Sequence, residues 1–168
     1  MNIEYLIKMK ITNNTDASAI GCTIRKAIQA DIDNIYKIEL MCFSEPWDYK
    51  NLVEMMELNL ASFYVAEIGE RIIGFSAGAI ENTDCKKYGH ICNIAVVPEM
   101  RGYGVGNLLM KHMEHDFYLQ KCDACSLEVR VSNEMAKKFY KKIGYTEVIV
   151  FGNYYPNNED AVIMMKWF

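Results

Sequence analysis

The stretch Arg101-Gly102-Tyr103-Gly104-Val105-Gly106 decides the fold of this 168-residue chain. It follows a strand-like run that ends at Pro98, and it precedes a run of apolar residues at helical spacing. Three glycines that alternate with other residues let a turn expose several backbone N–H groups in one direction, and the positive end of the next helix dipole lies behind them. The stretch therefore predicts a site for a ligand that carries phosphate.

The spacing of these glycines excludes two common nucleotide-binding loops. A P-loop places four residues between its glycines and continues with Lys and Ser or Thr, whereas this turn continues as Asn107-Leu108-Leu109. The dinucleotide fingerprint needs a third glycine where Asn107 stands, and no strand–helix–strand unit opens the chain. A glycine turn by itself can also be a plain connection between a strand and a helix, so the flanking residues have to decide.

Length and composition limit the class of protein. A chain of 168 residues fits one domain with one sizeable core. It has no run of eighteen uncharged apolar residues and no basic-then-apolar leader pattern, so we expect a cytoplasmic protein that does not bind membranes. A net charge of −4 argues against direct binding of nucleic acid and suits a cationic amine substrate better.

The six cysteines do not form a metal-binding pattern. Cys122 and Cys125 have the spacing of one ligand pair, but no second cysteine or histidine pair stands at ligand spacing. We therefore expect core or bystander thiols and no metal.

Hydrophobic periodicity and turn residues predict an α/β chain with four helices and seven strands. The strands are expected at 23–27, 62–67, 71–80, 88–97, 124–131, 145–153 and 161–167, and the helices at 31–41, 49–60, 104–119 and 133–143. The strand at 124–131 is nearly continuously apolar, which is typical of a strand covered on both sides. Residues 1–22 are interpreted as an extension without an assignable role, and residues 23–168 as one domain.

The helical spacing also predicts which side chains face the core. Asp31 stands where it would cap the first helix. The expected buried stripes are Ile32, Ile35, Ile38 and Met41; Leu52, Val53, Met56 and Leu60; and Leu108, Leu109, Met113 and Phe117.

The residues on both sides of the glycine turn carry a resemblance to a known family. Upstream stands the run from Gly89 to Pro98, and downstream the run from Leu127 to Asn133, followed by Ala136, Phe139-Tyr140 and Gly144-Tyr145. In this order the set resembles the GNAT superfamily of N-acetyltransferases. The resemblance extends from Thr23 to Trp167 and is closest to the ribosomal-protein alanine N-terminal acetyltransferases and the archaeal N-alpha-acetyltransferases.

This resemblance implies a fold and an activity. The fold is a single-domain GNAT fold, with a central mixed, mostly antiparallel sheet of six to seven strands flanked by about four helices. The activity is direct transfer, in a ternary complex, of an acetyl group from acetyl-coenzyme A to the free α-amine of a protein or peptide. Ribosomal proteins or nascent chains are the implied partners, and the protein is expected to be a monomer or weak dimer. Two alternatives stay open. The protein could be a lysine or small-amine N-acetyltransferase, or a non-catalytic subunit that binds acyl-coenzyme A.

The resemblance also implies which residues hold the coenzyme. Backbone groups of the turn would bind its pyrophosphate, the strand before the turn would bind the pantetheine arm, and Asn133 would contact the coenzyme. In the family a bulge splays this strand from its neighbour and frees an N–H near Ile94, which would polarise the thioester carbonyl. The full set is Ile94, Ala95, Val96, Arg101, Gly102, Tyr103, Gly104, Val105, Gly106, Asn107, Asn133 and Tyr140.

Two residues are implied for proton transfer. Glu128 is the candidate base, because it lies in an apolar strand where burial would raise its pKa, although it could also be an ion-paired structural group with Arg130 or a lysine. Tyr140 is the candidate acid for the departing thiolate. His90, or a water molecule, could take the proton instead of Glu128. Two segments resemble the loops that flank the peptide entrance in N-terminal acetyltransferases. The first contains Phe43, Glu45 and Trp47, and the second contains Tyr154 and Tyr155 near Glu159-Asp160.

Overall fold

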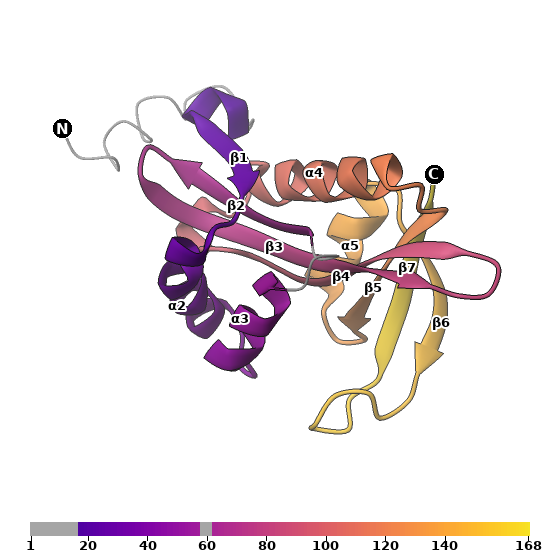
Figure 1. The fold of residues 1–168 in the computed structure, drawn as a ribbon. Coiled ribbons are helices and arrows are strands. Elements are labelled where there is room, and N and C mark those ends of the chain that lie inside the picture. Colours follow the sequence, from indigo (N-terminus) through magenta and orange to yellow (C-terminus); the bar gives the residue numbers. More distant parts are fainter. Residues whose placement is uncertain (1–16, 58–61) are drawn as a thin grey trace. The chain divides into compact units, whose positions relative to one another are not determined.

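Seven strands form one sheet in the order β1-β2-β3-β4-β5-β7-β6 (Figure 1). The structure is a computed structural model, and it describes residues 17–57 and 62–168. Each predicted strand is present within a few residues of its expected bounds. The strands are β1 (Cys22–Lys26), β2 (Ser62–Ile68), β3 (Arg71–Asn82), β4 (Lys87–Val96), β5 (Ala124–Arg130), β6 (Thr146–Phe151) and β7 (Ala161–Trp167).

Four α-helices lie in the described residues, as the periodicity predicts. They are α2 (Ile32–Cys42), α3 (Tyr49–Glu57), α4 (Val105–Leu119) and α5 (Glu134–Lys142). Three short 3-10 turns, η1 (Ala17–Ile20), η2 (Gln29–Asp31) and η3 (Pro98–Met100), precede β1, α2 and the glycine turn. The predicted end of α3, at residues 58–60, lies outside the described residues.

The sheet is mixed. β4 pairs with β5 in parallel, whereas β1 with β2, β5 with β7 and β6 with β7 pair antiparallel. β2 and β3 are joined by the two-residue turn Gly69-Glu70, in which Gly69 takes a positive φ of 61°. A connection this short joins antiparallel neighbours. This is the mixed, mostly antiparallel sheet of the expected fold.

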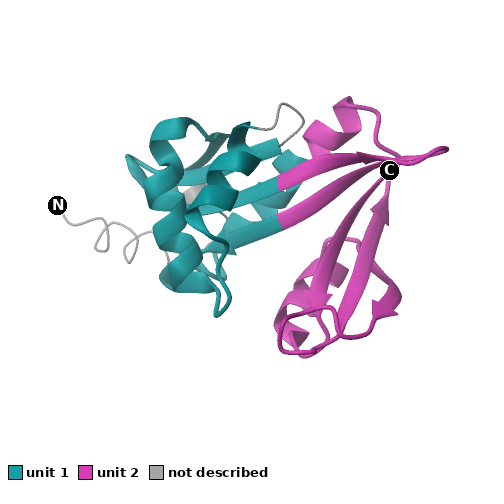
Figure 2. Cartoon of the chain, turned by 60° about the horizontal axis from the view of Figure 1, so that its bottom comes forward, with its two compact units in different colours: residues 1–77, 93–113 teal, residues 78–92, 114–168 magenta. Residues whose placement is uncertain are grey.

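Two compact units make up the α/β domain (Figure 2). Unit 1 comprises residues 1–77 and 93–113, and it holds β1, β2, α2, α3, the end of β4 and the start of α4. Unit 2 comprises residues 78–92 and 114–168, and it holds the start of β4 together with β5, α5, β6 and β7. The candidate site residues are divided between the two units, so each set is described within its own unit.

Two details of α2 differ from the prediction. Met41 is exposed, while Ile32, Ile35 and Ile38 are buried as expected. Asp31 does not cap α2 with its side chain, because its carboxylate accepts hydrogen bonds from the Ile28 N–H and from Arg25. The core side of α2 is therefore rotated away from Met41.

Two further predictions about burial are wrong. Leu108 is half-buried, while Val105 and Met110 join Leu109, Met113 and Phe117 in the core. β5 is buried on one face only, since its burial alternates along the strand. The half-exposed face carries Ser126, Glu128 and Arg130, so the apolar run did not mean that both sides of the strand are covered.

Part of the predicted N-terminal extension is folded. Residues 17–20 form η1, in which Ala17 and Ile20 are buried, and β1 begins at Cys22. Residues 1–16 lie outside the described part of the chain, so the domain boundary between residues 22 and 23 stays a prediction.

Candidate active site

The second half of β4 offers main-chain groups along one edge. The ladder between β4 and β5 joins Tyr88–His90 to Ala124–Ser126, whereas β4 continues to Val96. At the other edge the Val97 N–H donates to the Ile73 carbonyl of β3. Because strand residues alternate their hydrogen-bonding direction, the N–H groups of Ile94 and Val96 point away from β3, along an edge that the β4–β5 ladder leaves open within the described residues.

The regular alternation of β4 bears on the expected bulge. Burial alternates without interruption from Gly89 through Ile91 and Asn93 to Ala95. A bulge would insert an extra residue and shift this alternation. β4 therefore shows no such interruption, and the open edge begins where the ladder with β5 ends.

The glycine turn after β4 has the backbone that its sequence demands. Gly102 and Gly104 take positive φ values of 84° and 81°, a region that other residues enter at a cost. α4 begins at Val105, and the first backbone bond into the helix runs from the Leu108 N–H to the Gly104 carbonyl. The N–H groups before Leu108 have no partner within the helix. A Cβ at Gly102 would meet no protein atom within 4 Å.

Arg101 is exposed and folds back onto β4. Its Nε donates to the Val96 carbonyl at 3.0 Å, and the Cys42 thiol of α2 donates to the same oxygen at 3.5 Å. The Val96 carbonyl on the open edge therefore accepts hydrogen bonds from two side chains. Tyr103, Gly106 and Asn107, the other predicted members of the turn, are half-buried.

In unit 2, a histidine contacts both Glu128 and a second glutamate. His90 donates from Nε2 to Glu128 Oε2 and from Nδ1 to Glu81 Oε1, both at 2.7 Å. The Cys92 sulfur lies 4.0 Å from Nδ1. The hydrogen bond with Cys92 and the hydrogen bond to Glu128 raise the pKa of His90 to about 11 despite its partial burial. His90 is therefore an imidazolium near neutral pH, and both of its ring nitrogens carry a proton.

This cluster gives Glu128 an ion-pair partner that the sequence did not suggest. His90 pairs with Glu128 at 2.7 Å, while Arg130 pairs with Glu159 at 2.9 Å and bonds Asn157.

Tyr140 is buried in α5. Its ring lies 5.8 Å from that of Tyr145, and burial, followed by the charge of Tyr155, raises the pKa of the Tyr140 phenol. The phenol keeps its proton near neutral pH, as a proton donor must.

The loop between β6 and β7 brings two further tyrosines to the same cluster. Burial and the charges of Glu128, Cys92 and Glu81, in that order, raise the pKa of Tyr154. Burial raises the pKa of Tyr155 to about 12, and its ring lies 3.8 Å under the Arg130 guanidinium. Unit 2 thus brings together four predicted residues, which are Glu128, Tyr140, Tyr154 and Tyr155.

The carboxylate of Glu159 is fully engaged in holding this loop. It accepts from Arg130 through Oε2 and from the Ser132 N–H and hydroxyl through Oε1. The hydrogen bonds from Ser132, followed by that from Arg130, hold the pKa of Glu159 at about 2. Glu159 therefore anchors the loop to Arg130 and Ser132.

Asn133 is the N-cap of α5 and precedes the first helical residue. Its Oδ1 accepts from the Ala136 N–H at 3.1 Å, and the residue is exposed, whereas Tyr140 is buried. The cap uses the oxygen of Asn133, so its amide nitrogen is the group left for the predicted contact with the coenzyme.

The other predicted loop lies in unit 1, at the end of α2. Phe43 and Trp47 are half-buried, and Glu45 is exposed. The Trp47 N–H donates to Oε1 of Glu39 at 2.9 Å, and Asn93 Nδ2 of β4 donates to Oε2 at 2.9 Å. Glu39 is buried, and burial raises its pKa, against the effect of these two hydrogen bonds.

Sequence reasoning missed Glu39 and Asn93, although a signal was present. Glu39 stands seven residues after Ile32 and four after Ile35, on the buried side of α2, and Asn93 follows Ile91 in the buried alternation of β4. A charged residue at a core position of a helix has to find partners. No comparable signal pointed to Glu81, which reaches His90 only through the fold.

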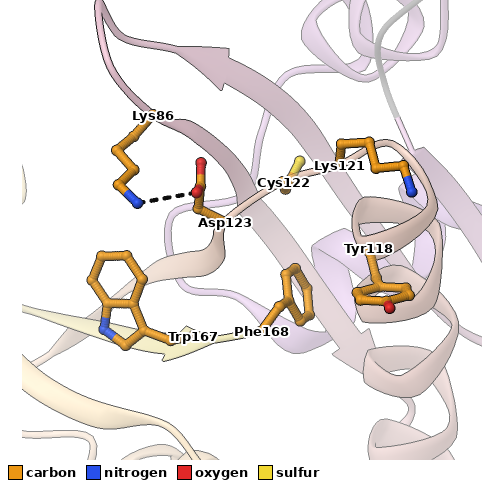
Figure 3. Close-up of a pocket in the computed structure, with 7 residues that line it drawn as sticks. All are labelled: Lys86, Tyr118, Lys121, Cys122, Asp123, Trp167 and Phe168. Carbon is orange, nitrogen blue, oxygen red and sulfur yellow. Dashed lines mark hydrogen bonds and ion pairs between the residues drawn. The ribbon is translucent and has the colours of Figure 1, made fainter.

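A surface hollow of about 440 Å³ in unit 2 contains none of the predicted residues. Figure 3 shows aromatic side chains of Tyr118, Trp167 and Phe168 around it, with Lys86 paired to Asp123. The candidate site therefore rests on the two clusters described above.

Within residues 17–57 and 62–168, no helix combines the length and apolar character that crossing a membrane requires.

Comparison with known proteins identifies the family. The model of the acetyltransferase (GNAT) family matches residues 32–145. An N-alpha-acetyltransferase of Sulfurisphaera tokodaii is 36% identical over 84% of this chain and 90% of its own length. A putative [ribosomal protein bS18]-alanine N-acetyltransferase of Bacillus subtilis is 35% identical over 84% of this chain and 92% of its own.

A solved structure shares the fold. The crystal structure of the ribosomal-protein-S18-alanine N-acetyltransferase from Escherichia coli matches with a TM-score of 0.77 and 26% identity, over 87% of this chain and 93% of that chain. With the family match and the seven-stranded sheet, this shows that the chain belongs to the GNAT family of acetyltransferases.

We predict that His90 stays protonated through neutral pH. An NMR titration, with the signal assigned by its loss in His90→Gln, should show no ionisation of this imidazole near pH 6.5, the ordinary value. Since folding raises its pKa, the stabilisation that His90 gives should be complete below pH 6.5 and decline as the pH rises toward 11. The difference in unfolding free energy between the parent and His90→Gln should thus be larger at pH 6 than at pH 9. An imidazole that titrates near pH 6.5 would contradict the assignment.

Proposed function

We propose that this protein moves an acetyl group from acetyl-coenzyme A to the free α-amine of a protein or peptide. One observation carries the proposal. The open N–H edge at Ile94 and Val96 is followed, after the short turn η3, by the glycine turn and the N-terminus of α4. The names of the relatives, which are N-alpha-acetyltransferases and ribosomal-protein alanine N-acetyltransferases, support the choice of an α-amine as acceptor.

The residues of unit 1 fit the coenzyme. Positive φ at Gly102 and Gly104 turns the chain so that the unpaired N–H groups at the start of α4 can bind a diphosphate. The edge of β4 can bind an extended amide-bearing arm as an added strand does. The Ile94 N–H is the group that would polarise the thioester carbonyl.

The chemistry needs a neutral amine and a proton for the leaving thiolate. When bound, acetyl-coenzyme A supplies the acetyl group as a thioester; the amine nitrogen bonds to its carbonyl carbon as the carbon–sulfur bond breaks. A peptide α-amine has a pKa of about 7.7 to 8.0, so it loses its proton readily near neutrality. Tyr140 then gives its phenolic proton to the sulfur.

Glu128 is proposed to take the proton of the amine, directly or through a water molecule. Its Oε2 is bound to His90, which leaves Oε1 as the acceptor. His90 itself is a poor base, because both ring nitrogens already donate to carboxylates. Its role is to orient Glu128.

The acceptor is proposed to be a ribosomal protein or a nascent chain, acetylated in the cytoplasm by a monomer or weak dimer. The residues proposed to contact the peptide are Phe43, Glu45 and Trp47 in unit 1, and Tyr154 and Tyr155 in unit 2. Paired tyrosines can present both apolar surface and hydroxyl groups to a peptide backbone.

The acceptor class is tested with labelled acetyl-coenzyme A and matched peptides. Peptides with a free N-terminus should be acetylated, and the same peptides with a blocked N-terminus and free lysines should not. A lysine amine has a reference pKa of about 10.4, so its proton is harder to remove. Equal labelling of blocked peptides would favour a lysine or small-amine acetyltransferase. Coenzyme binding without labelling of any amine would favour a non-catalytic subunit.

The glycine turn is tested with Gly102→Ala and Gly21→Ala. Both positions have positive φ and open space around a Cβ, so each change should lower the free energy of unfolding by about 1 kcal/mol. Only Gly102→Ala should raise the KM for acetyl-coenzyme A, by about tenfold, because a methyl group there holds a phosphate off the backbone. An unchanged KM would remove the turn from the coenzyme site.

The acid is tested with Tyr140→Phe, and Tyr145→Phe is the matched control. Removing the Tyr140 hydroxyl should lower kcat by about 100-fold, with a much smaller effect on the affinity for acetyl-coenzyme A. The Tyr145 ring is also buried and packs on Tyr140, so Tyr145→Phe should retain the parent kcat. Full activity of Tyr140→Phe in steady-state assays would refute the role.

A further inference from the structure

Glu39 is a buried carboxylate in unit 1 whose two hydrogen-bonding partners are both uncharged amides. Only 1% of its surface is exposed. Oε1 accepts from the Trp47 N–H and Oε2 from Asn93 Nδ2, each at 2.9 Å. Burying a carboxylate is costly, and two neutral donors compensate it less well than a cation would. An apolar side chain would fill this core position without that cost, so stability alone does not account for a glutamate here.

The two partners come from segments that the proposed reaction uses differently. Trp47 belongs to the loop after α2 that is proposed to contact the peptide. Asn93 precedes Ile94, whose N–H is proposed to meet the thioester carbonyl. Glu39 is thus bonded to the acceptor loop through one oxygen and to the donor strand through the other.

A second contact joins the same two elements three residues further along each of them. The Cys42 thiol donates to the Val96 carbonyl, and these residues follow Glu39 and Asn93 by three positions each. α2 is therefore attached to the second half of β4 at two points. The loop that leaves α2 at Phe43 begins from a fixed position relative to Ile94, and the Glu39–Trp47 bond fixes it again four residues later.

We propose that Glu39 is a positioning residue that holds the loop of residues 43–48 in register with the open edge of β4, so that the peptide amine is presented to the thioester. This role rests on the proposed function. Glu39 touches neither reactant, and it acts through Trp47 and Asn93.

Two substitutions at residue 39 separate positioning from simple core packing. Glu39→Met keeps much of the volume on the apolar side of α2 but removes both acceptors. Glu39→Gln can keep both hydrogen bonds. Its oxygen accepts from the Trp47 N–H, and its NH₂ donates to the Asn93 oxygen once the Asn93 side-chain amide has flipped by about 180°. Asp33→Asn is the matched control, because it neutralises another carboxylate of α2, which binds the Tyr49 hydroxyl at 2.9 Å on the exposed side.

Steady-state kinetics should divide the effects by substrate. For Glu39→Met we expect kcat/KM for the peptide to fall by about 10- to 100-fold, while the KM for acetyl-coenzyme A changes less than about twofold and the variant stays folded at the assay temperature. Glu39→Gln and Asp33→Asn should stay within about threefold of the parent. Parent-like kcat/KM in Glu39→Met, or an equal loss in Glu39→Gln, would overturn the proposal.

A readout that needs no turnover keeps this proposal distinct from the proposed function. Hydrogen exchange of the Trp47 amide should be slow in the parent and in Glu39→Gln, and fast in Glu39→Met. Equal protection in all three would show that Glu39 does not hold the loop, whatever the activity. If no peptide is acetylated by the parent while the exchange pattern appears as expected, then the acceptor assignment fails and the coupling of loop and strand stands.

Discussion

Main-chain N–H groups have to find partners, and this requirement shapes the candidate site. β4 bonds β3 along one edge, but its ladder with β5 ends at His90, so within the described residues this ladder provides no partner for the N–H groups of Ile94 and Val96 on the other edge. The first turn of α4 adds further unpaired donors immediately after the glycine turn. In the proposed function, a ligand with amide groups and a diphosphate would satisfy both sets, which would connect an ordinary strand and helix to acetyl transfer.

Within each unit, polar side chains hold the groups of the candidate site in place. In unit 1, Glu39 is bonded to the loop after α2 and to β4, both through uncharged donors. In unit 2, the His90 imidazolium holds Glu128 and Glu81, and Arg130 with Ser132 holds Glu159 in the loop that carries Tyr154 and Tyr155. Each cluster bonds a side chain or loop whose position matters for the proposed chemistry, and in unit 1 this carries the energetic cost of burying the Glu39 carboxylate.

Much of the fold could be predicted because it follows from local patterns. The two-residue turn at Gly69-Glu70, the alternation of β4 and the helical spacing of Leu109, Met113 and Phe117 each depend on neighbours in sequence. The errors arose where burial is decided by distant segments. Met41 and Leu108 fit apolar stripes but are not buried, and the apolar run of β5 has one half-exposed face. Periodicity gives the face of an element and does not say what covers it.

The amino-acid sequence by itself determined the family, the order of the helices and strands, and the glycine turn, because positive φ and strand or helix periodicity are local demands on residue type. It also gave Glu128, Tyr140 and the two loops as candidates, on the strength of their motifs. Only the tertiary structure decided the partners of those residues. Glu81 and Glu128 stand 47 residues apart and meet through His90, and Glu39 meets Asn93 across 54 residues. Such contacts depend on how strands pair and helices pack, which no single segment specifies.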